Sequence, residues 1–336
     1  MELSNQRTFI IAEAGVNHNG QLEIAKKLVD AAKEAGADAI KFQTFSAERI
    51  TCKKTRKANY QMENTGSDED QQQMLKKLQL SEAEFKDIKE YCDMKRIMFL
   101  STPFDIESLY FLLELGVDFI KVPSGEVTNY PYLVEVAKSG KPIILSTGMC
   151  DIEEVRECYE VLKCNGAEDI VVLHCTTQYP TAYRDVNLNA MLTLKDTFGC
   201  PVGYSDHTEG ILVPIAAVAM GACVIEKHFT LDRNMEGPDH KASLEPDELM
   251  RMVHGIRNIE DSMGDGIKVT QAVEEDNKVV ARKSIVARRH IEKGELLSVE
   301  NMTTKRPGNG ISPMEWNSIL GTLAIKDFEE DELIEV

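Results

Sequence analysis

Short apolar runs alternate with longer amphipathic segments along most of the chain. Runs of a few apolar residues bounded by turn residues predict buried strands, and apolar positions that recur every three or four residues predict helices. Several helical segments end in Gly, as expected where the residue after a helix turns left-handed. The clearest helical segments are 22–37, 81–95, 152–167 and 210–222, and the predicted strands are 9–13, 39–43, 98–101, 119–122, 143–147, 170–174, 202–205 and 224–228.

This succession of eight strand-then-helix units is typical of a (β/α)8 barrel, also called a TIM barrel. A doubly wound open sheet is the alternative α/β fold. Polar residues follow nearly every predicted strand at its carboxyl end, and a closed ring of strands would gather all of these residues around one site. The pattern therefore favours a barrel over residues 1–265.

Two stretches depart from this pattern. The connection over residues 46–73 is long, polar and weakly periodic, so it is either a solvated insertion or a functional loop over the barrel mouth. Residues 266–282 are charged and have the composition of a linker, and residues 283–336 alternate short apolar runs with turns. We expect the last segment to form a small, mostly β domain that packs on another surface, because it is marginal in size by itself.

The charge and the cysteine pattern narrow the class of protein. A net charge of −18 makes nucleic acid an unfavourable partner. The start of the chain has no features of a signal peptide, and no apolar run has membrane-spanning length. The eight cysteines form no CxxC pair, which indicates reduced thiols. We therefore expect a cytoplasmic protein with no membrane partner.

Two lysines lie near the carboxyl ends of predicted strands, where a barrel of this kind places its active-site groups. Lys41 and Lys121 are compact positive charges suited to a phosphate or a carboxylate, and Ser124 and Gly125 follow the second lysine with a hydroxyl group and backbone N–H donors. The alternative is that both lysines only pair with barrel glutamates. The first interpretation predicts an anion-binding site at the barrel mouth.

Two histidines and two glutamates are further candidates. His207 and His228 follow neighbouring predicted strands, and adjacent neutral imidazoles suit a divalent metal whose other positions are filled by water or substrate. The alternative is a pair of hydrogen-bonded histidines without a metal. Glu13 and Glu126 are candidate acid–base groups, and the alternative for Glu13 is a structural counter-ion for the lysines. Burial would raise the pKa of such a carboxyl group and a nearby lysine would lower it.

Nine motifs, in order, carry a resemblance to a known family over nearly the whole chain. They are IAEAGVNHNG, KFQTF, STPFD, KVPSGE, LSTGM, YSDHT, EKHFTLD, GPDHKASLEP and TKRPGNGIS. Each motif alone is weak, whereas the ordered set is specific. Together they resemble the sialic acid synthase family, which includes N-acetylneuraminate synthases and enzymes that make legionaminic and pseudaminic acids.

The resemblance implies a condensation reaction and its two substrates. Phosphoenolpyruvate condenses with an open-chain, N-acetylated mannosamine-type sugar to give a nine-carbon 2-keto acid and phosphate, with Mn²⁺ or Mg²⁺ as the metal. We take N-acetylmannosamine as the acceptor, which makes the protein an N-acetylneuraminate synthase. The alternative acceptor is 2,4-diacetamido-2,4,6-trideoxymannose, the substrate of an N,N'-diacetyllegionaminate synthase. The final segment resembles the SAF, or antifreeze-like, domain, which in the family crosses into the partner's barrel and implies a domain-swapped homodimer.

The resemblance also assigns roles to residues. Glu13 and Glu126 match the family's acidic catalytic residues, with Glu126 preferred as the base that activates water. His207 and His228 match its metal ligands, and Arg306 matches an arginine that the other subunit delivers to the N-acetyl group. The remaining positions match phosphoenolpyruvate contacts (Lys41, Thr102, Lys121, Ser124 and Ser205) and sugar contacts (Gln43, Asn64, Phe104, Tyr179 and Asp239).

One position departs from the family pattern. Many members have Asn where this chain has Thr177, and that Asn contacts phosphoenolpyruvate. The hydroxyl group of Thr177 acting through water and the hydroxyl group of Thr176 are the two candidate replacements.

Two other classes of protein fit parts of the sequence. A Schiff-base aldolase would use Lys41 or Lys121 as its nucleophile. A non-catalytic sugar-binding or ice-binding protein is suggested only by the final segment. The density of charged residues after the predicted strands argues against this non-catalytic class.

Overall fold

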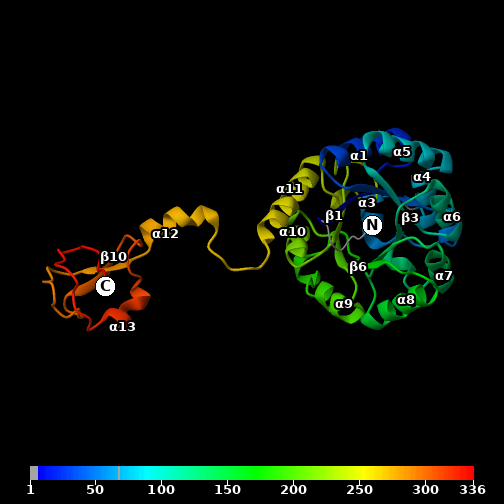
Figure 1. Cartoon of the computed structure of the whole chain (residues 1–336). Helices are drawn as coiled ribbons and strands as arrows, with labels where there is room; N and C mark the ends of the chain where they lie inside the picture. Colours follow the sequence, from blue (N-terminus) through cyan, green and yellow to red (C-terminus); the bar gives the residue numbers. More distant parts are fainter. Residues whose placement is uncertain (1–6, 67–68) are drawn as a thin grey trace. The chain divides into compact units, whose positions relative to one another are not determined.

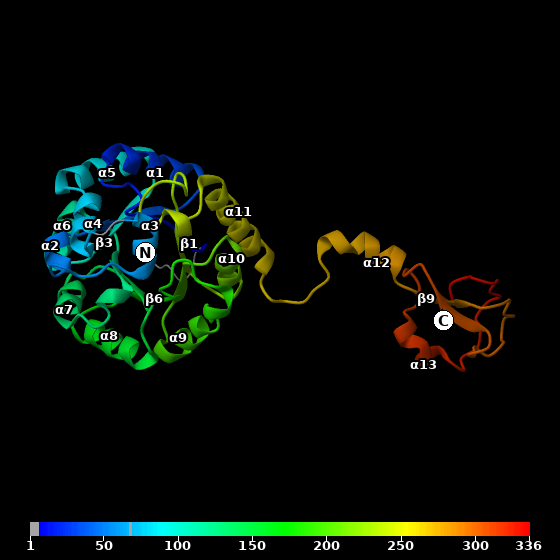
Figure 2. The ribbon, with the colours of Figure 1, turned by 180° about the vertical axis from the view of Figure 1, so that it is seen from behind.

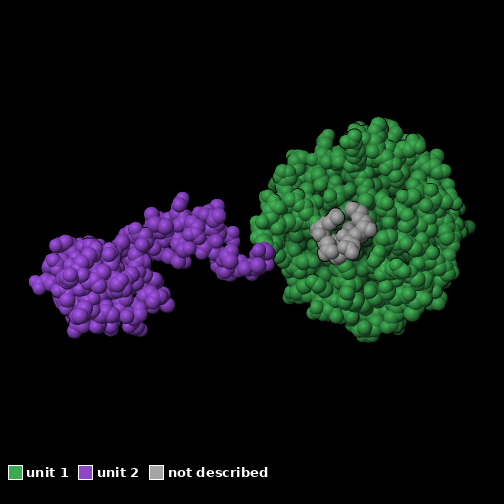
Figure 3. All heavy atoms as spheres, in the orientation of Figure 1, with its two compact units in different colours: residues 1–264 green, residues 265–336 purple. Residues whose placement is uncertain are grey.

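The computed structural model describes residues 7–66 and 69–336. The segment in which the sequence analysis found no export signal begins with residues 1–6, outside the described part. The chain forms two compact units, Met1–Gly264 and Asp265–Val336 (Figure 3). Within the described part, no helix combines the length and the apolar character needed to cross a membrane.

The first unit is built on one parallel sheet whose strands follow the order β3-β2-β1-β8-β7-β6-β5-β4. The two strands at the ends of this order lie side by side, so the sheet closes into a barrel (Figure 1). Its strands are β1 (Phe9–Gly15), β2 (Ala39–Thr44), β3 (Met98–Pro103), β4 (Ile120–Val122), β5 (Ile143–Ser146), β6 (Ile170–Cys175), β7 (Val202–Asp206) and β8 (Val224–His228).

Helices surround the barrel on its outer side (Figures 1 and 2). Helix α8 illustrates why they begin where they do, because the side chain of Asp151 accepts hydrogen bonds from the backbone N–H groups of Glu153 and Glu154. The surrounding helices are α1 (Leu22–Glu34), α5 (Glu82–Lys95), α6 (Ile106–Leu115), α7 (Tyr130–Lys138), α8 (Ile152–Cys164), α9 (Ala190–Phe198), α10 (Leu212–Ala219) and α11 (Pro246–Met263). The connections also contain the short 3-10 turns η1 (Ser124–Glu126), η2 (Tyr183–Asp185) and η3 (His240–Ala242).

The predicted (β/α)8 barrel is confirmed, and the open sheet is excluded. Each predicted strand corresponds to an observed one, with differences at the ends. β1 continues two residues beyond the predicted 9–13 because its last residues still pair with β2. β4 begins at Ile120, one residue later than predicted.

The barrel interior changes from apolar to charged along the strands. Successive side chains of a strand point to opposite faces, so every second residue faces the interior. On β1, Phe9 and Ile11 belong to an apolar cluster that fills the barrel, and Glu13 follows on the same face. On β8, Val224 belongs to that cluster, and Glu226 follows in the same way. The carboxyl ends of the strands therefore form a polar chamber above an apolar plug.

The β2–β3 connection contains three short helices, α2 (Ala47–Ile50), α3 (Asn59–Thr65) and α4 (Gln71–Leu78). None of these three helices was predicted from the sequence, because their turns are short and mostly polar. Met74 and Leu78 of α4 pack with Val16 and Phe45 in a small apolar cluster. This cluster fixes the connection at the end of the barrel where the strands finish. Residues 67–68 of the connection lie outside the described part.

The second unit has a core of its own, which includes Ile285, Ile291, Met302 and Phe328. Strands β9 (Ser284–Ala287) and β10 (Met302–Lys305) pair antiparallel. The remaining elements are η4 (Ala272–Glu274), α12 (Glu275–Ala281), η5 (Pro313–Glu315) and α13 (Trp316–Ile319). The first two of these fall within 266–282, the segment with the composition of a linker.

Candidate active site

A cavity of about 170 Å³ lies at the carboxyl ends of the strands, and every strand of the barrel contributes at least one residue to its lining. It brings together residues that are far apart in the sequence, as the barrel prediction required. The predicted site residues that line it are Glu13, Lys41, Gln43, Thr102, Phe104, Lys121, Ser124, Tyr179, Ser205, His207 and His228.

Lys41 is held by three partners at the centre of this cavity. Its ammonium nitrogen lies 2.7 Å from Glu13 Oε2 and 3.5 Å from Glu226 Oε2. It also donates to Thr102 Oγ1 at 2.9 Å. All four side chains are buried, so these interactions are little screened by solvent. The lysine is thus fixed in one position before any ligand arrives.

Lys121 has a similar environment on the other side of Glu226. Its ammonium group donates to Ser146 Oγ at 2.7 Å and lies 3.6 Å from Glu226 Oε1. The same carboxylate oxygen accepts from Ser205 at 2.9 Å. The Glu226 carboxylate on β8 therefore links two lysines and a serine that lie on three other strands, β2, β4 and β7. Both lysines pair with glutamates, as the alternative interpretation expected, and both also line the cavity, where anion binding stays a prediction.

Glu226 was not among the predicted site residues, although a signal for it existed. It lies two residues before His228 on β8, and alternation along a strand directs both side chains to the same face. A predicted inward-facing histidine thus implies an inward-facing Glu226.

The two central carboxyl groups differ in their acidity. Burial raises the pKa of Glu13 to about 7, and the nearby Lys41 only partly opposes this effect. Burial also acts to raise the pKa of Glu226, but Lys121 and Lys41 outweigh it and lower the pKa to about 2. Carboxyl groups whose environments separate their pKa values in this way are suited to different roles. Glu226 is therefore the more acidic of the two carboxyl groups.

His207 and His228 lie next to each other, with ring centres 5.6 Å apart. His207 Nδ1 donates to the carbonyl of Thr176 at 2.7 Å, which leaves its Nε2 as a free acceptor when the ring is neutral. His228 Nδ1 is buried without a hydrogen-bond partner. Burial lowers the pKa of both rings, which favours the neutral form that binds metals.

This pair of histidines fits a divalent metal ion. Neutral imidazoles suit such ions, and the unpartnered His228 nitrogen is a ligand atom without another role in the described structure. Among the described residues, no group of three or more His, Cys, Asp or Glu side chains is placed to hold a metal. The remaining positions would therefore come from water or substrate, as the sequence analysis expected for an open site.

Four predicted residues do not line the cavity. Glu126 follows Gly125, which does line it, and its carboxylate accepts from Asn129 at 2.5 Å. Burial raises the pKa of Glu126. Arg306 belongs to the second unit, where its Nε donates to the carbonyl of Ala281 at 3.0 Å.

The other two, Asn64 and Asp239, lie close together. Asn64 on α3 donates to the carbonyl of Pro238 at 2.6 Å, which places it beside Asp239 in the chain. Asp239 is buried, and burial raises its pKa to about 6. Helix α3 is therefore attached to the segment that carries one of the predicted sugar contacts.

A second contact of α3 was not predicted from the sequence. The ring of Tyr60 stacks on Tyr179 with centres 5.0 Å apart, and Tyr179 lies 4.2 Å from His207 by the same measure. The β2–β3 connection therefore reaches the cavity wall, which supports its interpretation as a functional loop over the barrel mouth. Nothing in the weakly periodic sequence of this connection singled out Tyr60.

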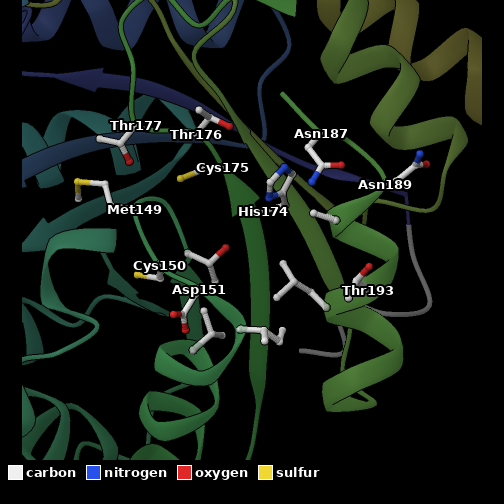
Figure 4. A pocket seen from close by; sticks show the side chains of 15 residues that line it. Met149, Cys150, Asp151, His174, Cys175, Thr176, Thr177, Asn187, Asn189 and Thr193 are labelled. Atoms are coloured by element: carbon white, nitrogen blue, oxygen red, sulfur yellow. The ribbon is translucent and has the colours of Figure 1, made fainter. Parts of the chain in front are cut away.

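A second, larger cavity of about 680 Å³ adjoins the first between α8 and α9. Figure 4 shows Met149 and Asp151 on one side of it and Asn189 and Thr193 on the other. No lysine or arginine lines it, unlike the central cavity. Its chemistry therefore does not suit an anion.

Three residues separate the two cavities and line both of them: Met149, Cys175 and Thr177. Thr177 Oγ1 is buried and has no hydrogen-bond partner, so its hydroxyl group remains available to a ligand. Thr176 Oγ1 instead has a long contact of 3.4 Å with the carbonyl of Asp185. Of the two candidates for the missing Asn, the geometry favours Thr177.

A closed barrel with paired lysines, carboxylates and histidines at its mouth has the arrangement of an enzyme active site. The chain belongs to the NeuB family, whose model matches residues 28–268, and the SAF domain model matches residues 282–335. The family predicted from the nine motifs, the catalytic nature of the protein and the SAF domain are thereby confirmed.

Named relatives extend over almost the whole chain. The N,N'-diacetyllegionaminic acid synthase of Campylobacter jejuni is 54% identical over 98% of this chain and 99% of its own length. The enzyme with the same name from Legionella pneumophila is 50% identical over 95% of this chain and 91% of its own length. The solved structure of the N-acetylneuraminic acid (sialic acid) synthetase from Leptospira borgpetersenii has a TM-score of 0.72 and 37% identity, over 81% of this chain and 90% of that one.

Proposed function

We propose that the protein condenses phosphoenolpyruvate with 2,4-diacetamido-2,4,6-trideoxymannose to give N,N'-diacetyllegionaminic acid and phosphate. The observation that carries the proposal is the buried Lys41–Glu226–Lys121 arrangement in a cavity shared with two histidines. It offers positive charge to an anion next to a site for the acceptor carbonyl.

The acceptor differs from the one that the sequence analysis put first. Identities of 54% and 50% to two enzymes named for diacetyllegionaminic acid, against 37% to one named for sialic acid, favour the diacetamido sugar over N-acetylmannosamine. The diacetamido sugar has an acetamido group on carbon 4 and a methyl group as carbon 6. N-acetylmannosamine has hydroxyl groups on both carbons. The sequence analysis contained this acceptor as its alternative.

The lysines bind and orient phosphoenolpyruvate in this proposal. Lys41 and Lys121 hold its two charged groups, and Thr102, Ser124 and Ser205 add hydroxyl donors around it. Fixing the nucleophilic carbon near the acceptor carbonyl removes much of the entropy barrier of a two-substrate reaction. Glu226 keeps both lysines in place while the cavity is empty.

His207 and His228 would hold a divalent metal, Mn²⁺ or Mg²⁺, which supplies Lewis-acid polarisation of the acceptor aldehyde. Attack by C3 of phosphoenolpyruvate on the aldehyde carbon leaves a cationic centre at C2 of phosphoenolpyruvate. Water adds to this centre before phosphate leaves by C–O cleavage. Glu13 lines the cavity and burial raises its pKa, so we assign proton transfer to it before Glu126, which does not line the cavity.

The acceptor-binding residues are Gln43, Phe104, Tyr179 and Asp239, with Asn64 attached beside Asp239. Arg306 offers a planar fork of donors for an amide oxygen, and we propose that it serves the site of a partner subunit in a domain-swapped homodimer. A monomer in light scattering with full activity would contradict this arrangement. The cytoplasmic location remains a prediction from the sequence.

The test is phosphate release from phosphoenolpyruvate with Mn²⁺, with the two candidate sugars supplied in parallel. We expect kcat/KM to be at least tenfold higher with the diacetamido sugar, and EDTA to abolish the reaction. Faster turnover of N-acetylmannosamine would reinstate the sialic acid synthase. Borohydride trapping of pyruvate on the protein, with no effect of EDTA, would instead support the Schiff-base aldolase.

Replacing Gly148 with alanine is expected to raise the KM for phosphoenolpyruvate about tenfold, since overpacking costs about 1–3 kcal/mol. A Cβ atom there would lie 2.2 Å from Thr177 Oγ1 and 2.7 Å from Cys175 Sγ. The Gly148 N–H group also donates to Ser124 Oγ at 2.8 Å. Steady-state kinetics at saturating acceptor measures the effect.

Gly255 provides the matched control for this substitution. A Cβ atom at Gly255 would lie 2.6 Å from Ile215 Cδ1, so it is similarly crowded, but neither residue lines the cavity. Gly255→Ala should leave the KM for phosphoenolpyruvate unchanged. Equal KM values for Gly148→Ala and the unmodified protein would mean that the wall around Gly148 does not shape the site.

A further inference from the structure

Tyr60 lies at the barrel mouth although it belongs to a connection outside the barrel. Its ring stacks on Tyr179 at 5.0 Å with an angle of 29° between the planes. The centre of the Tyr179 ring in turn lies 4.2 Å from the ring centre of His207 and 5.8 Å from that of His228. A continuous row of aromatic rings therefore leads from the candidate metal ligands to α3.

Helix α3 is fixed at two points that are one turn apart. Residues four positions apart lie on the same face of a helix, so Tyr60 and Asn64 face the same way. Tyr60 meets Tyr179, and Asn64 donates to the carbonyl of Pro238, next to Asp239. Burial raises the pKa of the Tyr60 hydroxyl group, and the charge of Asp239 adds to this effect. One face of α3 thus meets both sides of the proposed acceptor site.

The position of Tyr60 relates it to one part of the acceptor. An open-chain sugar whose aldehyde lies at the histidines extends away from them, with carbons 4 to 6 farthest from the reacting end. Tyr60 is two ring contacts away from His207, whereas Tyr179 is one. The groups on carbons 4 and 6 are also those that distinguish the two candidate acceptors.

From this arrangement we propose that Tyr60 contacts the distal half of the acceptor. Its ring selects the acceptor with an acetamido and a methyl group at carbons 4 and 6 over the acceptor with hydroxyl groups at both carbons. The inference rests on the proposed function and adds a specificity residue to it. Methyl-bearing groups pack favourably on an aromatic face, whereas hydroxyl groups lose hydration there without gaining a partner. The Tyr60 hydroxyl group has one long contact, 3.4 Å from Gln61 Nε2, so the ring is the part that selects.

The test compares Tyr60→Ala and Tyr60→Phe with both sugars under the phosphate-release assay. Tyr60→Ala should lower kcat/KM at least tenfold for the diacetamido sugar and at most threefold for N-acetylmannosamine. The KM for phosphoenolpyruvate should stay within twofold. Tyr60→Phe keeps the ring and should keep the ratio between the two sugars within threefold of its original value. Thermal unfolding of both variants checks that the barrel remains folded.

Tyr110 provides the matched control, because it is 46% exposed on α6 and lies outside the cavity. Tyr110→Ala should leave kcat/KM unchanged for both sugars. If Tyr60→Ala lowers kcat/KM by the same factor for both sugars, Tyr60 does not select the acceptor. The same conclusion follows if the KM for phosphoenolpyruvate rises by as large a factor. If Tyr60→Ala is destabilised, Tyr60→Phe still decides, since a changed ratio there would overturn the role of the ring. Failure of the unmodified protein to release phosphate with either sugar would refute the proposed function instead.

Discussion

Lys121→Met is expected to lower kcat/KM for phosphoenolpyruvate by about 10²- to 10³-fold, because truncating one partner of a buried charge pair costs about 2–5 kcal/mol. The Lys121 side chain is only 5% exposed and shares Glu226 with Lys41. Methionine preserves most of the volume but leaves Glu226 with one lysine and gives the incoming anion one positive charge fewer. Steady-state kinetics with phosphoenolpyruvate as the varied substrate measures the loss.

Lys138 is the matched control for this charge. Its side chain is 58% exposed and pairs with Glu135 on the outer surface of α7, so Lys138→Met should change kcat/KM by less than twofold. A decrease of less than threefold for Lys121→Met would mean that the anion does not bind beside this lysine. The cavity would then need another substrate.

Lys227→Met is expected to have the largest effect on stability, about 3–5 kcal/mol of the free energy of unfolding. Lys227 and Asp206 are fully buried, with 2.6 Å between the ammonium nitrogen and Asp206 Oδ2. Tyr204 and Thr208 also donate to this carboxylate. Without the lysine, Asp206 is a buried charge that lacks its counter-ion. Urea unfolding of the full chain, monitored by circular dichroism, measures the change.

A double variant separates the charge effect from loss of packing. Asp206→Asn combined with Lys227→Met removes both charges and should recover at least half of the lost stability, since neither charge is then left unpaired. Lys138→Met, which breaks an exposed pair, should change the free energy of unfolding by less than about 0.5 kcal/mol. A double variant less stable than Lys227→Met alone would show that charge pairing is not the source of the effect.

The barrel could be predicted from the sequence because parallel strands covered on both faces are nearly continuous apolar runs. The apolar run just before Glu13 and the one just before Glu226 both have this form, and both became strands whose ends meet in the cavity. Strand ends differed by one or two residues because pairing with a neighbour, which is not local in sequence, decides where a strand stops.

Cavity-lining residues were predictable where they lie on a strand or shortly after its end, and less so where they lie far along a connection. Glu226 could have been found by alternation from His228, since a strand fixes the direction of every second side chain. Tyr60 could not, because its place depends on how a polar connection folds back onto Tyr179. The acidity of Glu13 was also unpredictable, because it depends on the balance between burial and the proximity of Lys41.

The most direct test of the proposed condensation is the mass of its product. The full-length protein would be incubated with Mn²⁺, uniformly ¹³C-labelled phosphoenolpyruvate and the unlabelled diacetamido sugar, and the products analysed by mass spectrometry together with free phosphate. We expect a nine-carbon 2-keto acid with three labelled carbons, formed one for one with phosphate. Labelled pyruvate released with the phosphate, and no labelled nine-carbon acid, would contradict the proposed condensation.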